Sequence, residues 1–240
     1  MYKIVKIIVD KKIQLVYYFI IMDKQAVYED IKQLIIKEKL LPGQWLVERE
    51  LCTTYSISRT PIREILWKLT ADGFLEQESN RGFTVMKLGL EKIFEVFQTR
   101  EAVEGMAARL ASRKGDESFR SRLEEIKEKL IRVDIEADPS RGSALGRQIH
   151  SAVMEAAGNG MMADIYGKLK NLAILTSNIT TKSSAIERVS KEAHLEIIKA
   201  ILDQDEEKSE RVMREHLRET CRQVVEQFYP GMLGGASNNK

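Results

Sequence analysis

Residues 27–85 read VYEDIKQLIIKEKLLPGQWLVERELCTTYSISRTPIREILWKLTADGFLEQESNRGFTV, and this stretch decides the fold of the N-terminal part of the chain. Its apolar spacing predicts an amphipathic helix over 26–39, which the Leu-Pro-Gly sequence at 41–43 stops, and a short second helix over 47–55. A third helix starts after Ser58. The segments FLEQE and FTV, joined by a turn, then predict a β-hairpin.

The third helix carries the residues that point to a function. Ser58 is a good N-cap, because its hydroxyl can accept a hydrogen bond from an amide of the first turn, and Pro61 lies in that turn, where a missing N–H costs nothing. Arg59, Thr60 and Arg63 are left on the outward, N-terminal part of the helix. The inward face is an apolar stripe at the spacing i, i+3, i+4 and i+7, formed by Ile62, Ile65, Leu66 and Leu69.

The order of helix, helix, short turn, helix and hairpin is that of a winged helix-turn-helix. An α-helix fits the major groove of duplex DNA, where its N-terminal residues reach base edges and phosphates. A hairpin with Arg81 at its tip can lie on the DNA backbone or in the minor groove. The alternative is an ordinary small helical bundle with a solvated basic face. The pattern favours DNA binding over that alternative.

The residues of this stretch closely resemble the DNA-binding domain of the GntR family of bacterial transcription regulators. The shared motifs occur in order along about sixty residues: the LxPG turn, ERE-L, SRTP-x-RE, L-x-x-L-x-x-x-G before a hydrophobic residue and Leu, and x-RG-x-x-V. One departure is Val47, at a position where the family often has a serine that caps the second helix.

The resemblance implies, residue by residue, which side chains contact DNA. Trp67 receives no such role, because a tryptophan at this place more often packs against a neighbouring helix. The implied contacts lie on the second helix, the recognition helix and the wing tip: Arg49, then Ser58, Arg59, Thr60 and Arg63, then Arg81 and Gly82.

The remainder of the chain shows no strand pattern and predicts an all-α bundle. Its resemblance is to the FCD domain of the fatty-acid-regulator-like branch of the GntR family. The expected helices are 89–113, 117–136, 140–157, 161–180, 184–203 and 206–229. The predicted fold is therefore mostly α. An unassigned N-terminal extension at 1–22 precedes a winged helix-turn-helix domain at 23–88. An FCD-like ligand-binding and dimerisation domain at 89–230 follows, and then a disordered tail at 231–240.

Composition narrows the class of protein further. The 240 residues carry 38 Lys and Arg against 36 Asp and Glu, so the whole chain is no polycation and any basic character is local. Cys52 and Cys221 lie far apart, which excludes a disulfide framework or a CxxC metal site and predicts reduced thiols in a cytoplasmic protein.

The first 22 residues are unusual, because basic residues precede an uncharged run from Ile13 to Met22. That run is shorter than the ~20 residues that span a bilayer, and no small-residue cleavage site follows it. A signal peptide and a membrane segment are therefore not expected. We expect translation to start at Met22, since the recognisable pattern begins at Ala26.

All three histidines of the chain fall on apolar, inward-facing stripes of different predicted helices. The stripes place His150 with Val153, His194 with Ile197, and His216 with Val212. A single histidine on such a stripe is more often a core residue, and that alternative stays open here. Because all three histidines of the chain lie on such stripes, the pattern indicates that they converge on one metal ion. Neutral imidazole is a common ligand of Zn, Ni or Fe.

The resemblance bears on the metal as well. Metal-binding FCD domains carry Asp-x-x-x-His on one helix, a histidine in a Glu-x-His-x-x-Ile motif and another about twenty residues later. His150, His194 and His216 match these histidines, whereas Gly146 takes the place of the aspartate. Loss of that carboxylate is expected to weaken metal binding, or to leave the position to water or to an effector.

An effector site is expected in the same domain. The resemblance places Arg100 in an Arg-x-x-x-Glu stretch, and a guanidinium presents a two-pronged set of donors to a carboxylate. The alternative for Arg100 is an ion pair with Glu101 or Glu104. Asn178, on the inward face of a later helix, is a weaker candidate for the same pocket.

These expectations combine into a ligand-responsive transcription regulator, a cytoplasmic homodimer that acts as a repressor without any membrane contact. Its two winged domains are expected to bind a pseudo-palindromic operator in double-stranded DNA, under the control of a small organic acid. One alternative is a metal-dependent hydrolase that uses the three histidines, although no HExxH or nucleophile motif supports it. Another is a DNA-binding protein without an effector.

Overall fold

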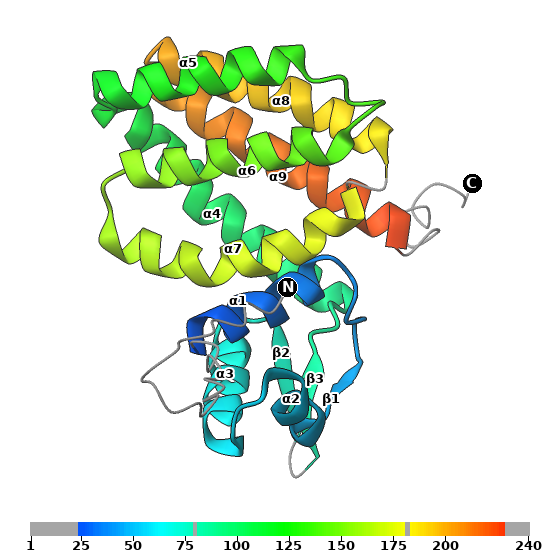
Figure 1. Cartoon of the computed structure of the whole chain (residues 1–240). Coiled ribbons are helices and arrows are strands. Elements are labelled where there is room, and N and C mark those ends of the chain that lie inside the picture. The colour runs from blue at the N-terminus through cyan, green and yellow to red at the C-terminus, as the bar shows by residue number, and fades with distance from the viewer. Residues whose placement is uncertain (1–23, 79–80, 181–182, 229–240) are drawn as a thin grey trace, which may run out of the picture. The chain divides into compact units, whose positions relative to one another are not determined.

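A computed structural model of the chain describes residues 24–78, 81–180 and 183–228, with the side chains of 177–180 and 228 left aside. The described residues form two compact units that divide between Lys87 and Leu88 (Figure 1). The predicted extension 1–22 and tail 231–240 lie outside the described residues.

The N-terminal unit contains three helices and a small antiparallel sheet. In chain order its elements are α1 (Lys24–Ile36), β1 (Trp45–Leu46), α2 (Glu48–Tyr55), α3 (Arg59–Ala71), β2 (Leu75–Glu78) and β3 (Gly82–Val85). Their order and the β2–β3 hairpin confirm the predicted winged helix-turn-helix.

The sheet has one strand more than the predicted hairpin. Its order is β1-β3-β2, with Trp45 opposite Thr84 and Leu46 opposite Phe83. A strand of two residues is too short to show an alternating pattern, so the sequence does not predict β1. The segment after the Leu-Pro-Gly turn is held against β3 by backbone hydrogen bonds from Gly43 to Val85 and from Val85 to Gln44, both of 2.9 Å.

The predicted apolar stripe of α3 forms the centre of this unit. Ile62, Leu66 and Leu69 are fully buried, together with Val27 and Ile31 of α1. Burial of each such side chain stabilises the fold by about 1.5–3 kcal/mol. The stripe therefore fixes α3 in place and leaves the opposite face of this helix to solvent.

Ser58 stands at the N-cap of α3 as predicted, but its hydroxyl does not cap the helix. Its backbone is extended, with φ −73° and ψ 170°, and among the described residues its side chain accepts no capping hydrogen bond from an amide of the first turn. The predicted cap is therefore wrong in this detail, and the hydroxyl of Ser58 is not committed to the helix end.

The C-terminal unit is an all-α bundle, as predicted. Its helices are α4 (Leu90–Lys114), α5 (Glu117–Arg132), α6 (Pro139–Ala156), α7 (Gly160–Thr180), α8 (Ser184–Leu202) and α9 (Glu206–Phe228). The helix α4 runs through the bundle against α6, α7, α8 and α9 (Figure 1). None of the described helices combines the length and apolar character that a membrane span needs.

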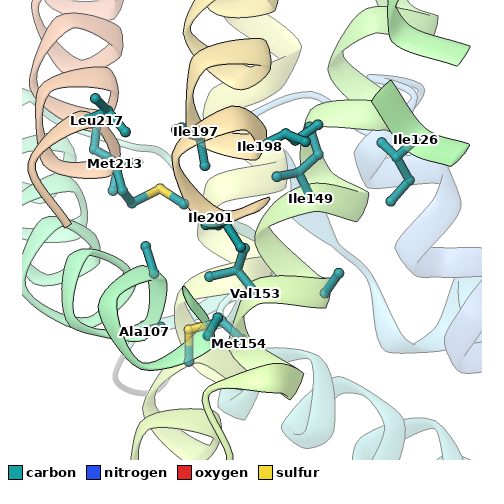
Figure 2. Close-up of a cluster of buried hydrophobic side chains, with 14 of the residues drawn as sticks. Ala107, Ile126, Ile149, Val153, Met154, Ile197, Ile198, Ile201, Met213 and Leu217 are labelled. Carbon is teal, nitrogen blue, oxygen red and sulfur yellow. The ribbon is translucent and has the colours of Figure 1, made fainter. Parts of the chain in front are cut away.

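Apolar side chains from α4, α5, α6, α8 and α9 form the core of the bundle. Figure 2 shows those of α6, α8 and α9 pointing toward one another between their ribbons. The core therefore ties together the same three helices that carry the histidines. Its labelled members from these helices include Ile149, Val153, Ile197, Ile198, Ile201, Met213 and Leu217.

The helix α5 ends at Arg132, four residues before the predicted end at 136. The carboxylate of Asp134 accepts backbone hydrogen bonds from Glu136 at 3.0 Å and from Ala137 at 3.3 Å. An aspartate that bonds its own following backbone offers the chain an alternative to the helix, which ends α5 early.

Candidate functional site

A groove on the N-terminal unit runs between α2, the start of α3 and the sheet. Its volume is about 620 Å³. Arg59 and Arg63 project from α3 with 74% and 64% of their side chains exposed, and Arg81 at the wing is 75% exposed. Ser58 and Thr60 lie at the adjoining start of α3. The other five of the seven predicted DNA contacts line this groove, which we call the arginine groove: Arg49, Arg59, Arg63, Arg81 and Gly82.

Gly82 and two tryptophans shape the wall of the arginine groove. Gly82 has φ +110°, a conformation that favours glycine, and a Cβ built there would lie 3.9 Å from the ring of Trp45. The ring of Trp67 meets the ring of Phe83 edge-on, with 5.4 Å between the ring centroids. Trp67 therefore packs against strand β3 of the wing.

A glutamate that the sequence analysis did not single out lies between the two arginines of α3. The Nε of Arg63 donates to Oε1 of Glu48 at 2.9 Å, and the Nε of Arg59 lies 3.9 Å from Oε2. No periodicity signals this arrangement, because Glu48 belongs to α2 and the arginines to α3.

The three histidines converge in the C-terminal unit, as predicted. His150 of α6, His194 of α8 and His216 of α9 are each at most 6% exposed. One ligand atom from each ring lies within 4.8 Å of the others, and the Nε2 atoms of His150 and His194 are 3.2 Å apart. Three buried imidazoles at this spacing form a donor set that suits Zn, Ni or Fe.

A buried carboxylate holds one of these rings. Oε2 of Glu104 lies 2.5 Å from Nδ1 of His150, and Oε1 accepts a 2.6 Å hydrogen bond from Nε of Arg100. Burial by itself raises the pKa of Glu104, but Arg100 and His150 outweigh it and lower the pKa to about 2. The ionised carboxylate directs Nδ1 of His150 toward itself and leaves Nε2 to the cluster.

The other two histidines are neutral at ordinary pH. Burial lowers the pKa values of His194 and His216 well below 6.5, and repulsion from a neighbouring imidazole when it is protonated and from Arg100 lowers them further. A metal ion binds the deprotonated ring, so these two side chains need lose no proton before they coordinate.

Gly146 has a specific relation to His194. A Cβ atom at position 146 would lie 2.4 Å from Cε1 of the His194 ring and 3.0 Å from each ring nitrogen. The space next to Gly146, where the family resemblance implies an aspartate, is thus filled by the His194 ring. The donor set that fits a metal in this chain is therefore three histidines with an outer carboxylate, Glu104.

A cavity of about 60 Å³ adjoins the cluster. Arg100 lines this cavity, and its bond to Glu104 is the ion pair that the sequence left open as the alternative.

Arg147, which no sequence motif singled out, also lines the cavity and donates from Nη1 to Oγ of Ser143 at 2.8 Å. Burial lowers the pKa of Arg147, and the opposing charge of Glu187 raises it. Asn178 lies in the last turn of α7, among the side chains that are not described.

Two family descriptions match the chain, one in each unit. Residues 23–85 match "Bacterial regulatory proteins, gntR family", and residues 95–219 match the FCD domain. The second match alone spans more than half of the chain.

The similar proteins are transcription regulators. The Nta operon transcriptional regulator of Aminobacter aminovorans is 26% identical over 187 residues, which cover 77% of this chain and 86% of that protein. The transcriptional repressor RspR of Escherichia coli K12 is 25% identical over 201 residues, covering 83% and 88%. The solved structure of E. coli McbR/YncC has the same fold, with a TM-score of 0.71, 21% identity and coverage of 85% and 98%.

These relatives are regulators and not enzymes, which sets the hydrolase alternative aside. The family match in the N-terminal unit also implies DNA binding. The chain belongs to the GntR family of bacterial transcription regulators and carries a C-terminal FCD domain.

Proposed function

We propose that this chain is a ligand-responsive repressor, with a DNA-binding domain at 23–88 and an effector domain at 89–230. The observation that carries the proposal is the pairing of two sites in one chain: an arginine-lined groove on a winged helix-turn-helix and a cavity lined by buried histidines and by arginines in a helical bundle. The repressor RspR is a similar protein, which supports this direction of response.

The arginine groove is the proposed contact with double-stranded DNA. Arg59 and Arg63 stand at the start of α3, where a recognition helix reaches guanine edges or phosphates. Arg49, Ser58 and Thr60 adjoin them and supply phosphate contacts. Arg81 and Gly82 bring the wing onto the DNA backbone, because glycine permits its close approach.

The proposed effector is a small carboxylate bound in the cavity. Arg100 gives one N–H to Glu104 and has further guanidinium donors for a ligand, while Arg147 brings a second positive charge to the same cavity. A cavity of about 60 Å³ favours a small acid over a bulky one. Asn178 is kept as a further candidate contact.

The proposed cofactor is a divalent Zn, Ni or Fe ion held by His150, His194 and His216. When bound, the metal supplies a fixed positive charge to the cavity. Glu104 orients the His150 ring from behind, and the three helices α6, α8 and α9 are held together at the cluster.

Repression is proposed to require a homodimer on a pseudo-palindromic operator, since a two-fold protein binds a two-fold DNA site. The effector changes operator affinity only as far as it binds more tightly to one arrangement of the two DNA-binding domains than to the other.

Two measurements test this function. Elemental analysis of the untagged protein should find one first-row metal per chain, and His150→Ala should lose it. Fluorescence anisotropy with a duplex that the wild-type protein selects from a random pool should then show release by one member of a panel of small mono- and dicarboxylates. A protein that selects a duplex, yet whose melting temperature and DNA affinity respond to no acid of the panel, would be a DNA-binding protein without this effector.

A further inference from the structure

The carboxylate of Glu48 is shared by two arginines of the recognition helix. Oε1 accepts the 2.9 Å hydrogen bond from Arg63, and Oε2 faces the Nε of Arg59 at 3.9 Å. Arg59 and Arg63 are four residues apart on α3 and therefore lie on the same side of that helix. The single carboxylate of Glu48 on α2 thus contacts both of the arginines, Arg59 and Arg63, that are proposed to bind DNA.

Glu48 is held more firmly than the arginines it contacts. It is the first residue of α2, and its side chain is 20% exposed, against 64% and 74% for Arg63 and Arg59. A carboxylate in the first turn of a helix is also favoured by the helix dipole. The glutamate is therefore the fixed partner, and the arginines are long side chains tethered to it.

Glu48 faces each guanidinium on its Nε side, through a hydrogen bond with Arg63 and an ion pair with Arg59. A guanidinium has five N–H donors, and the bond from Nε of Arg63 uses one of them. The four N–H donors of the terminal nitrogens make no hydrogen bond to Glu48 among the described residues, and they lie at the end of the side chain that would reach into a DNA groove. An arginine restrained at Nε loses less conformational entropy when its terminal nitrogens bind a base edge.

The same carboxylate also lowers the positive charge that the groove presents to phosphates. Arg49, Arg59, Arg63 and Arg81 line the groove together with Glu48. Attraction to phosphates is independent of sequence, so an acidic group among the arginines penalises every DNA site, including the wrong ones.

We infer that Glu48 is a positioning residue for sequence readout: it orients Arg59 and Arg63 toward base edges and restrains their attraction to any phosphate backbone. The inference rests on the proposed function, in which these arginines contact DNA. Glu48 raises the ratio of specific to non-specific affinity without touching a base itself.

The test compares two duplexes of equal length, one selected by the wild-type protein from a random pool and one with the same bases scrambled. Glu48→Gln keeps an oxygen acceptor but removes the charge. It is expected to bind the scrambled duplex more tightly, with a steeper dependence on salt, and to lower the affinity ratio at least about fivefold. A repeated selection with this variant should give less sharply defined bases.

A second variant separates position from charge. Glu48→Asp keeps the charge but withdraws the carboxylate by one methylene from Arg63. It should lower the affinity ratio without tighter binding to the scrambled duplex. Glu50→Gln is the matched control, because it makes the same charge change on the same helix, about 200° around the axis from Glu48. Thermal unfolding verifies that each variant is folded.

Equal shifts for both duplexes, or the same affinity ratio in Glu48→Gln and Glu50→Gln, would overturn the inference while leaving DNA binding intact. A wild-type protein that enriches no sequence from the pool would instead overturn the proposed function, and the role of Glu48 with it.

Discussion

The ring of His194 lies against the backbone of Gly146, so closely that a Cβ atom at 146 would come within 2.4 Å of Cε1. His194 belongs to α8 and Gly146 to α6. The position of the ring limits the size of the residue at 146, and the size of that residue limits the position of the ring. A glycine is required as long as the ring keeps this position, because the ring takes the space that a larger side chain at 146 would need. The space beside Gly146, which the sequence predicts to be left to water or to an effector, is therefore occupied by an imidazole ring.

Gly146→Ala is predicted to disrupt the cluster, because the added methyl group forces the His194 ring away from His150. The free energy of unfolding should fall by about 1–3 kcal/mol, the usual cost of overpacking a core. Affinity for Zn or Ni should fall with it. Urea unfolding and metal titration measure the two effects.

Gly167→Ala is the matched control for this change. Position 167 is also in a helix, α7, but a Cβ there meets no atom within 4 Å. This variant should be more stable by about 0.5–1 kcal/mol, the usual gain of alanine over glycine in a helix. Unchanged metal affinity in Gly146→Ala would mean that the His194 ring does not bind metal from the position described.

Glu104→Gln is predicted to weaken metal binding while all three histidines stay in place. Loss of the carboxylate beside Nδ1 of His150 should lower the affinity about 10–100-fold, the effect usual for partners that orient a metal ligand. Competition with a chelator of known affinity measures the change. Glu101→Gln removes the same charge from the same helix, at a residue that pairs with Arg218 of α9, and should leave the affinity unchanged. Equal affinities in the two variants would rule out the orienting role.

Arg59→Ala and Arg63→Ala are each predicted to cost about 1–3 kcal/mol of specific DNA binding, because each would remove a contact to a base edge. Anisotropy with the selected duplex gives the affinities. Arg132→Ala, at an exposed arginine of the helical unit, is the control. Wild-type affinity and base preference in both variants would show that α3 is not the recognition helix.

The thiol of Cys221 is predicted to resist alkylation at mildly alkaline pH. Burial raises its pKa from 9.0 to about 11, and the thiolate is the reactive form. At about pH 8 it should react at least about tenfold more slowly in the folded protein than in denaturant, where the shift is lost. Mass spectrometry after timed alkylation follows it, with the half-buried Cys52 as internal reference. Equal rates in both states would contradict the buried position.

The sign of the corresponding stability effect follows from the same shift. Because the folded pKa of Cys221 is above the unfolded value, its contribution is fully present below pH 9 and is lost as the pH rises toward 11. Cys221→Ala should therefore show a smaller loss of stability over that interval than the wild type.

The sequence predicts the helices well, because each buries one apolar stripe. The stripe of α3 and the inward positions of His150, His194 and His216 all follow from a period of 3.6 residues. The meeting of the three histidines follows only from the tertiary packing of α6, α8 and α9. The sequence indicated this meeting indirectly, because none of the histidines falls on an outward-facing position of its predicted helix.

The parts that could not be predicted are contacts between elements. Glu48 reaches Arg63 from another helix, and Arg147, which follows Gly146 in α6, lines the cavity. Glu104 was visible only as an ion-pair partner of Arg100, through their spacing on α4. Its second contact, to His150, depends on how α4 packs against α6, which no local pattern encodes.

Both tryptophans of the chain, Trp45 and Trp67, lie in the wall of the arginine groove, and both are about half exposed. All tryptophan emission from this protein therefore originates at one surface. Selective excitation of indole reads that surface without an attached dye, and the edge-on contact between Trp67 and Phe83 makes the emission sensitive to any movement of the wing against α3. The regulator thus carries its own optical probe at the place where DNA is expected to bind.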